Sequence, residues 1–294
     1  MTHWKQGLLV AGLIIAHNSI ACTIDGEEGF LPQNNFNISV DAKRLGGITE
    51  EQFNSVIDKI EGMYAPIVSS EPSAPVLKVI RNWTDGTVNA YAQQTGKDWK
   101  VSMFGGLARH EAITPDGFAL VVCHELGHHI GGAPRKSSAW ASPWASNEGQ
   151  SDYFANLKCL RRVWNDEDNT TVVATLEVPA ALSEKCASAF TGQEASLCIR
   201  GGMAGMSVAK LFQSLYSETN SPKFETPSAK VVVKTDDNHP ATQCRLDTYF
   251  QGSLCEKSFN ENVDAKSEVT GTCHATTGQT LGLRPLCWFK PSVL

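Results

Sequence analysis

The sequence predicts an α+β fold in two parts, a compact core of helices around a small sheet and a smaller lobe held together by disulfides. Segments with helical and with strand-like spacing of apolar residues alternate up to about residue 165. Cysteines then concentrate after residue 243, where covalent links can replace a hydrophobic core. With 294 residues, 41% of them hydrophobic and 19% charged, the chain is long enough for one main domain with appendages.

The first 21 residues have the pattern of a secretory leader, a signal peptide. Lys5 precedes an apolar run at 7–16, and small residues lead up to Cys22. The run is too short to span a bilayer, and no later segment is long and apolar enough. We therefore expect an exported protein of the periplasm or cell envelope.

Cys22 resembles the processing site of bacterial lipoproteins, where a lipidated cysteine attaches the chain to a membrane. Ser19 stands where such sites usually have a leucine-like residue, so cleavage after Ala21 with a free thiol at Cys22 is the alternative. Residues 22–40 are polar and are expected to form a linker or tether, or a prosegment that is removed.

The core is expected to span residues 41–235 and to open with a helix. Residues 49–52 read Thr-Glu-Glu-Gln, a capping box, and predict a helix that runs to about Tyr64.

Strand-like segments follow this helix. Residues 76–83 and 87–93 alternate as strands do, and Asp85-Gly86 between them predicts a hairpin turn. The segment 99–109 mixes apolar residues with glycine, as expected of an edge strand that another backbone approaches closely. A strand with a bulge is the alternative for this segment.

The next helix is predicted from about Pro115 to Ile130. Thr114 is a suitable N-cap, proline is favoured at the first helical position, and Gly131 is expected to end the helix.

This helix carries the pattern His124-Glu125-x-x-His128. Histidines four positions apart project from one face of a helix and can bind one metal ion, and Glu125 lies close enough to take a proton from metal-bound water. A chance match on a solvated helix face is the alternative. His129 points away from the pair and is interpreted as a cation at the helix end.

A second helix is predicted to begin at Asn147 and to carry Glu148 and Asp152. A catalytic zinc site needs three protein ligands and an open position for water, so Glu148 is the expected third ligand. Asp152 stands one turn further along, where its carboxylate can accept the free ring N–H of a ligand histidine. A first-turn glutamate favoured by the helix dipole and a surface aspartate are the alternatives.

Farther along, His239-Pro and Arg245 fit the pattern H-P-x-x-x-x-R. Together with H-E-x-x-H and E-x-x-x-D, this order resembles the gluzincin metallopeptidases, in particular the branch of HtpX and the CaaX prenyl endopeptidases, over residues 48–165 and 236–246. The resemblance implies that His239 stabilises the oxyanion and that Arg245 braces acidic groups at the site. A plain turn is the alternative for His239.

The resemblance implies a compact gluzincin (zincin-like) core that holds one catalytic Zn²⁺ and hydrolyses a peptide or protein substrate. His124, His128 and Glu148 would bind the ion, and Glu125 would act as general base. If 99–109 is the edge strand, an extended substrate could bind there by main-chain hydrogen bonds. The candidate substrate-binding residues are then Gly105, Gly106 and Leu107. The lack of a membrane-spanning segment argues against processing of prenylated proteins.

A second function class is a zinc-stabilised binding or adhesion lipoprotein on the cell surface, without turnover. The glutamate beside an intact ligand set disfavours this class, whereas a loop at 135–146 that blocks the cleft would favour it. A net charge of −6 and a pI near 5.8 argue against a nucleic-acid partner.

The last third of the chain adds helices and the lobe. Residues 178–217 are apolar and helix-prone apart from Gly192 and the glycines at 201 and 202. Residues 236–294 are expected to form a cysteine-rich lobe that holds His239 and Arg245 against the site, and an independent interaction module is the alternative.

Eight cysteines besides Cys22 can form four disulfides in an exported protein. Closeness in sequence suggests three of the pairs, although spacing alone does not fix the connectivity. These pairs are Cys186–Cys198, Cys244–Cys255 and Cys273–Cys287.

Overall fold

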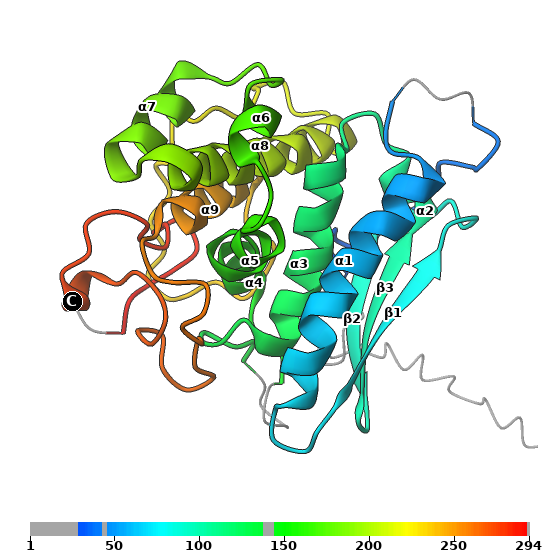
Figure 1. The fold of residues 1–294 in the computed structure, drawn as a ribbon, viewed down its shortest axis with the longest axis horizontal. Coiled ribbons are helices and arrows are strands. Elements are labelled where there is room, and N and C mark those ends of the chain that lie inside the picture. The colour runs from blue at the N-terminus through cyan, green and yellow to red at the C-terminus, as the bar shows by residue number, and fades with distance from the viewer. Residues whose placement is uncertain (1–28, 43–45, 138–143, 293–294) are drawn as a thin grey trace, which may run out of the picture.

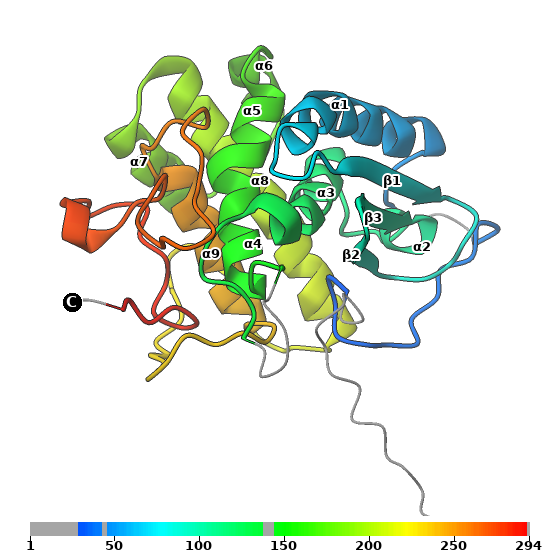
Figure 2. The same ribbon diagram turned by 90° about the horizontal axis from the view of Figure 1, so that it is seen from below.

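The protein has an α+β fold in which one buried helix separates a small sheet from a group of packed helices (Figure 1). The structure is a computed structural model, and it describes residues 29–42, 46–137 and 144–292. The signal peptide and Cys22 lie outside the described residues. Figure 2 shows the sheet beside α1 and α3, with α4, α8 and α9 on the other side of α3.

The sheet consists of β1 (Val76–Asn82), β2 (Ala90–Thr95) and β3 (Asp98–Phe104) in the order β1-β3-β2. β3 is the central strand, parallel to β1 and antiparallel to β2. Both outer strands pair with the same residue of β3, since Val79 and Ala92 each lie opposite Val101.

Two sequence predictions about this sheet are wrong. The hairpin joins β2 to β3 around Gly96, and not β1 to β2 through Asp85-Gly86. Asp85 instead folds its own backbone into a turn, since its carboxylate accepts from the N–H of Thr87. The segment 99–109 is not an edge strand, because β3 is hydrogen-bonded on both sides.

The short helix α2 (Gly105–Ala108) follows β3 and is buried. The N–H of Gly106 donates to the carbonyl of Asp85, and the N–H of Leu107 donates to the carbonyl of Thr87. A Cβ on Gly105 would lie 1.8 Å from the carbonyl oxygen of Trp83. The predicted substrate-binding residues Gly105, Gly106 and Leu107 are therefore packed against the chain itself and leave no room for a peptide.

Helix α1 (Glu50–Ser69) begins with the predicted capping box, in which Thr49 and Gln52 satisfy each other's backbone N–H groups. It runs beyond Tyr64 and buries an apolar face against the core. Helix α3 (Pro115–Ile130) has the predicted bounds, with Thr114 as N-cap and Gly131 as C-cap. Almost all of α3 is buried, which places its polar residues in the interior.

A continuous helical segment after residue 147 comprises α4 (Glu148–Phe154), the π-helical turn η1 (Ala155–Leu160) and α5 (Arg161–Trp164). The remaining helices are α6 (Asn169–Val173), α7 (Ala180–Ala189), α8 (Gly192–Leu215), α9 (Thr242–Leu254) and the short 3₁₀ turn η2 (Ala275–Thr277).

Helices α8 and α9 pack closely along their lengths. Gly201 and Gly205 lie inside α8, where a Cβ would meet Ser253 Oγ at 2.6 Å and the Tyr249 Cβ at 2.8 Å. Of the glycines that appeared to interrupt this helix in the sequence, Gly201 is thus one that lets the two helices approach, and Gly202 faces Leu182 of α7.

The described residues contain four disulfides, which are typical of an oxidising environment. The predicted pair Cys186–Cys198 is confirmed. The pairs Cys244–Cys255 and Cys273–Cys287 are wrong, because the structure forms Cys244–Cys287 and Cys255–Cys273. Cys244 and Cys255 stand at opposite ends of α9, about 16 Å apart at 1.5 Å of helical rise per residue, far beyond disulfide reach.

The fourth disulfide, Cys123–Cys159, links α3 to η1. None of the helices in the described ranges is long and apolar enough to cross a membrane.

Candidate metal centre

Two helices bring three potential metal ligands together inside the core. His124 and His128 project from α3, and Glu148 is the first residue of α4. One ligand atom from each lies within 4.8 Å of the others, and all three residues are buried. The Asn147 side chain caps α4 by accepting from the N–H of Gln150, which fixes where the glutamate emerges.

Gly127 lets the two helices approach at this point. A Cβ on Gly127 would lie 3.1 Å from the Cα of Ser151 in α4. Cys123 on α3, which precedes the first ligand, forms a disulfide with Cys159 in η1, the turn that continues α4. The spacing between histidines and glutamate is thus set both by a glycine contact and by a covalent link.

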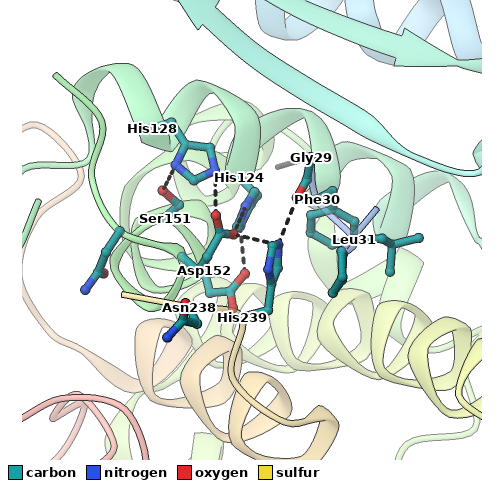
Figure 3. Close-up of polar contacts among 12 residues, drawn as sticks. Gly29, Phe30, Leu31, His124, His128, Ser151, Asp152, Asn238 and His239 are labelled. Atoms are coloured by element: carbon teal, nitrogen blue, oxygen red, sulfur yellow. Dashed lines mark hydrogen bonds and ion pairs between the residues drawn. The ribbon is translucent and has the colours of Figure 1, made fainter. Parts of the chain in front are cut away.

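Each ligand histidine has its outer ring nitrogen already engaged (Figure 3). The Nδ1–H of His124 donates to Asp152 Oδ1 at 2.7 Å. His128 Nδ1 lies 2.8 Å from the carbonyl of Ser146 and 3.0 Å from Ser151 Oγ, which Figure 3 labels. These contacts hold both rings with Nε2 facing Glu148, and Nε2 is the atom that a metal ion would bind.

The inner atoms of the group have no hydrogen-bond partner among the described residues. They are the Nε2 of His124 and both carboxylate oxygens of Glu148. Buried polar atoms without partners are costly, and a cation held between them would satisfy all of them. The residues therefore fit a metal ion, although the structure does not show which one.

Two basic side chains lie beside Glu148. Lys136 Nζ lies 2.8 Å from Oε1, at ion-pair distance but outside hydrogen-bond geometry, and His239 Nε2 lies 3.4 Å from Oε2. Burial alone would raise the pKa of Glu148, but His239 and Lys136 lower it well below its usual value. The carboxylate is therefore ionised and available as a ligand.

Asp152 connects the ligand helix to α9. Its carboxylate accepts from Arg245 Nε at 2.8 Å and Nη2 at 2.7 Å, and from the Tyr249 hydroxyl at 2.8 Å. Burial would raise the pKa of Asp152, but the charge of Arg245 and the hydrogen bond from His124 lower it. The aspartate stays ionised in a buried network that orients His124.

Glu125 is buried beside the ligand group, and neither of its oxygens has a hydrogen-bond partner among the described residues. Burial raises its pKa to about 7. A carboxyl group with this pKa can accept and return a proton near neutral pH.

His239 lies at the edge of the same site. Its Nε2–H donates to the carbonyl of Gly29 at 2.8 Å, beside the ring of Phe30 (Figure 3). The structure thus brings together most of the residues that the sequence singled out. They are His124, Glu125, His128, Glu148, Asp152, His239 and Arg245.

His129 points away from the ligand pair, as predicted, but it is not a helix-end cation. Its ring is stacked between Trp99 and Trp144, with Nε2 3.1 Å from the carbonyl of Lys100 and Nδ1 3.2 Å from the amide of Gln94. Burial lowers its pKa to about 4, so the ring is neutral.

Sequence reasoning missed several groups at the site. Tyr249 lies four positions after Arg245 on α9, and this helical spacing could have identified it. No pattern marked Lys136, the Ser146 carbonyl or Phe30, because these groups reach the site through tertiary packing.

No family model, curated protein or solved structure matches this chain. The chemistry of the site is therefore argued from its own geometry. A buried two-histidine, one-carboxylate group beside an unpaired carboxyl with a raised pKa can hold a metal ion and move a proton next to it.

Proposed function

We propose that this protein is an exported zinc metalloendopeptidase of the gluzincin type. The observation that carries the proposal is the ligand group His124, His128 and Glu148, whose inner atoms have no hydrogen-bond partner among the described residues and which stands beside Glu125. The order of its motifs along the chain, which resembles that of gluzincins, supports it.

Zinc fits this set better than other common ions. Calcium and magnesium prefer all-oxygen sites, whereas two imidazoles and one carboxylate are a frequent catalytic zinc set that leaves a position for water. When bound, Zn²⁺ supplies a Lewis acid that lowers the pKa of water and polarises a carbonyl.

Different side chains would then transfer the proton, stabilise the developing charge and orient the ligands. Glu125 takes the proton of the attacking water and gives it to the leaving amine. His239 donates a hydrogen bond to the carbonyl oxygen as negative charge develops there. Asp152, held by Arg245 and Tyr249, keeps His124 in the orientation and tautomer that a ligand needs.

The test compares the wild type with Glu125→Gln in the oxidised full chain. We expect about one zinc per protein in both by elemental analysis, because Glu125 is not a ligand. Chelator-sensitive cleavage of casein should be lost only in the variant, by a factor on the order of 10² or more. Folded protein without zinc, or full activity of the zinc-loaded variant, would contradict the proposal.

The alternative is a zinc-stabilised surface binding or adhesion protein. The complete burial of the ligands favours it, since a peptide cannot reach a closed site. Stoichiometric zinc without cleavage of casein or of a peptide library by either protein would support this alternative.

Attachment to a membrane through Cys22 is a separate proposal, supported by the leader pattern in the sequence. A fatty-acid probe should label the wild type and not Cys22→Ser. Equal labelling of both would exclude lipidation at this residue.

A further inference from the structure

A short segment of the chain, residues 29–31, crosses the candidate metal centre. The N–H of Phe30 donates to the carbonyl of Ala90, the first residue of β2, at 2.9 Å, and the N–H of Leu31 donates to the side chain of Asn89. The chain bends at residues 30–33, so the segment meets the start of β2 and the residue before it and does not run along the strand.

The main chain of this segment is held from end to end. Asn89 makes two bonds to Leu31, accepting from its N–H at 2.9 Å and donating to its carbonyl at 3.1 Å. The two preceding carbonyls are bound by the site itself, that of Gly29 by His239 at 2.8 Å and that of Phe30 by Arg245 at 2.9 Å. Apart from the bond to Ala90, these bonds come from the side chains of Asn89, His239 and Arg245, and together they hold the main chain of the segment in one position across the site.

The side chains of the segment are fitted as closely as its backbone. Phe30 is fully buried, with its ring edge-on to His124 at 4.9 Å and beside Phe212 at 5.3 Å. A Cβ on Gly29 would lie 2.3 Å from the carbonyl of Ala90, so only glycine fits at this position. The residue whose carbonyl meets His239 is therefore small, and the residue after it fills an aromatic pocket.

We infer that residues 29–31 are an intramolecular pseudosubstrate, which occupies the substrate groove with the Gly29–Phe30 bond where the cleaved bond of a substrate would lie. The inference rests on the proposed peptidase function and adds its regulation and its substrate class. The groove is formed by Ala90 and Asn89 on one side and by His239 and Arg245 on the other. The substrates are peptides with a small residue before the cleaved bond and a large apolar residue after it, and they bind only when the segment leaves.

A purely structural role for Phe30 as a core residue predicts something different. In that case, truncating Phe30 opens a cavity and weakens both stability and peptide binding. If the segment is a pseudosubstrate, the same truncation weakens the occupant and makes the groove more available to an added peptide.

The test measures binding, which needs no turnover. The peptide acetyl-Glu-Glu-Gly-Phe-Leu-Pro-amide, which repeats residues 27–32, is titrated by calorimetry into zinc-loaded full-length Glu125→Gln protein. Adding Phe30→Ala should tighten peptide binding by about tenfold or more, because a tethered competitor acts at millimolar effective concentration. Phe36→Ala, six residues after Phe30, is the matched control, since Phe36 is 41% exposed and lies outside residues 29–31, and it should change nothing.

Gly29→Ala provides a second variant whose Phe30 is intact. Its Cβ forces the segment away from Ala90, so peptide binding should again tighten. Unchanged or weaker peptide binding in both Phe30→Ala and Gly29→Ala would overturn the inference. The register is tested by mass spectrometry of the active, zinc-loaded wild type, where a cut within residues 27–34 is expected between Gly29 and Phe30. A cut at a neighbouring bond would overturn the register.

The outcomes for the two proposals are separable. If the zinc-loaded wild type cleaves casein but the variants bind the peptide no better, the peptidase proposal stands and the pseudosubstrate is wrong. If the variants bind the peptide more tightly but no protein or peptide is ever cleaved, the groove and its occupant stand and the peptidase proposal fails.

Discussion

At the scale of single residues, Asp152 connects the most partners at the site. One carboxylate accepts hydrogen bonds from His124, Arg245 and Tyr249, and none of these groups is exposed to solvent. Because this carboxylate balances the charge of Arg245 in the interior, the aspartate stabilises the fold, and in the proposed metal site it also orients a ligand.

We expect Asp152→Asn to weaken zinc binding by about 10- to 100-fold, because the amide loses the charge that orients and polarises His124. It should also lower the free energy of unfolding by on the order of 3 kcal/mol, since Arg245 stays buried without a counter-charge. A chromophoric chelator measures the first effect and urea unfolding of the zinc-free protein the second. Asp166→Asn, an exposed aspartate, is the control, and equal effects of the two variants would contradict the expectation.

Lys136 acts on the same ligands in the opposite direction. Its ammonium group lies 2.8 Å from Glu148 Oε1, so it would repel a metal ion bound at this carboxylate. Lys136→Met should therefore tighten zinc binding, by on the order of tenfold for a partly buried charge at short range. Competition with a chelator measures this change, with Lys97→Met as an exposed control; weaker zinc binding in Lys136→Met would show that the lysine positions Glu148 instead.

At the scale of elements, the contact between α3 and α4 sets the geometry of the ligands. A Cβ on Gly127 would lie 3.1 Å from the Cα of Ser151, and backbone cannot yield as a flexible side chain does. We expect Gly127→Ala to push α4 away and to reduce zinc affinity by tenfold or so, as displaced ligands lose ideal geometry. Chelator competition at fixed pH measures this affinity.

Gly62→Ala on α1 is the matched control for that variant. A Cβ there meets nothing within 4 Å, so the better helix propensity of alanine should stabilise the protein by about 0.5–1 kcal/mol and leave zinc affinity unchanged. A loss of zinc affinity in Gly62→Ala would mean that general helix changes, and not the α3–α4 contact, control the site.

Local sequence patterns such as helix caps predicted the helices, but they did not predict which distant segments pair with one another. The caps at Thr49 and Thr114 act within one turn of backbone, so the starts of α1 and α3 follow from sequence alone. The β1–β3 pairing and the Cys244–Cys287 disulfide join segments that are separated along the chain. Closeness in sequence predicted the wrong strand and cysteine partners.

The candidate site divides in the same way. The spacing of His124 and His128 places both imidazoles on one face of α3, so their relative position follows from the sequence. The spacing of Glu148 and Asp152 does the same on α4. Phe30 and Gly29 lie in a segment without periodicity, and their place depends on the start of β2, for which the sequence predicted the wrong neighbouring strand.

At the scale of the whole molecule, the metal centre joins parts that are distant in sequence. α3, α4, α9 and residues 29–31 meet there, and without a metal their buried carboxylates and imidazoles are left with poor partners. Zinc should therefore stabilise the entire fold, by about 4 kcal/mol when the free ion exceeds its dissociation constant a thousandfold. Urea unfolding with zinc or with a chelator measures this, and identical curves would show that zinc does not bind the folded state preferentially.

The acid stability of the molecule should depend on His129, which ties the end of α3 to the sheet. Burial between Trp99 and Trp144 lowers its pKa to about 4, whereas an unfolded histidine has a pKa near 6.5. Above pH 6.5 both states are neutral and the contribution is fully present. As the pH falls from 6.5 to 4 only the unfolded state takes up the proton, so stability declines by on the order of 3 kcal/mol and then levels off.

His129→Phe keeps a ring between the two tryptophans and removes this titration. It should be less stable at pH 7, because the carbonyl of Lys100 loses its partner, and yet it should lose less stability between pH 6.5 and 4 than the wild type does. Urea unfolding in the presence of a chelator measures both slopes without a contribution from metal release, and the other buried groups contribute equally to each protein. Parallel pH curves for the two proteins would contradict the expectation, because they would mean that folding does not lower the pKa of His129.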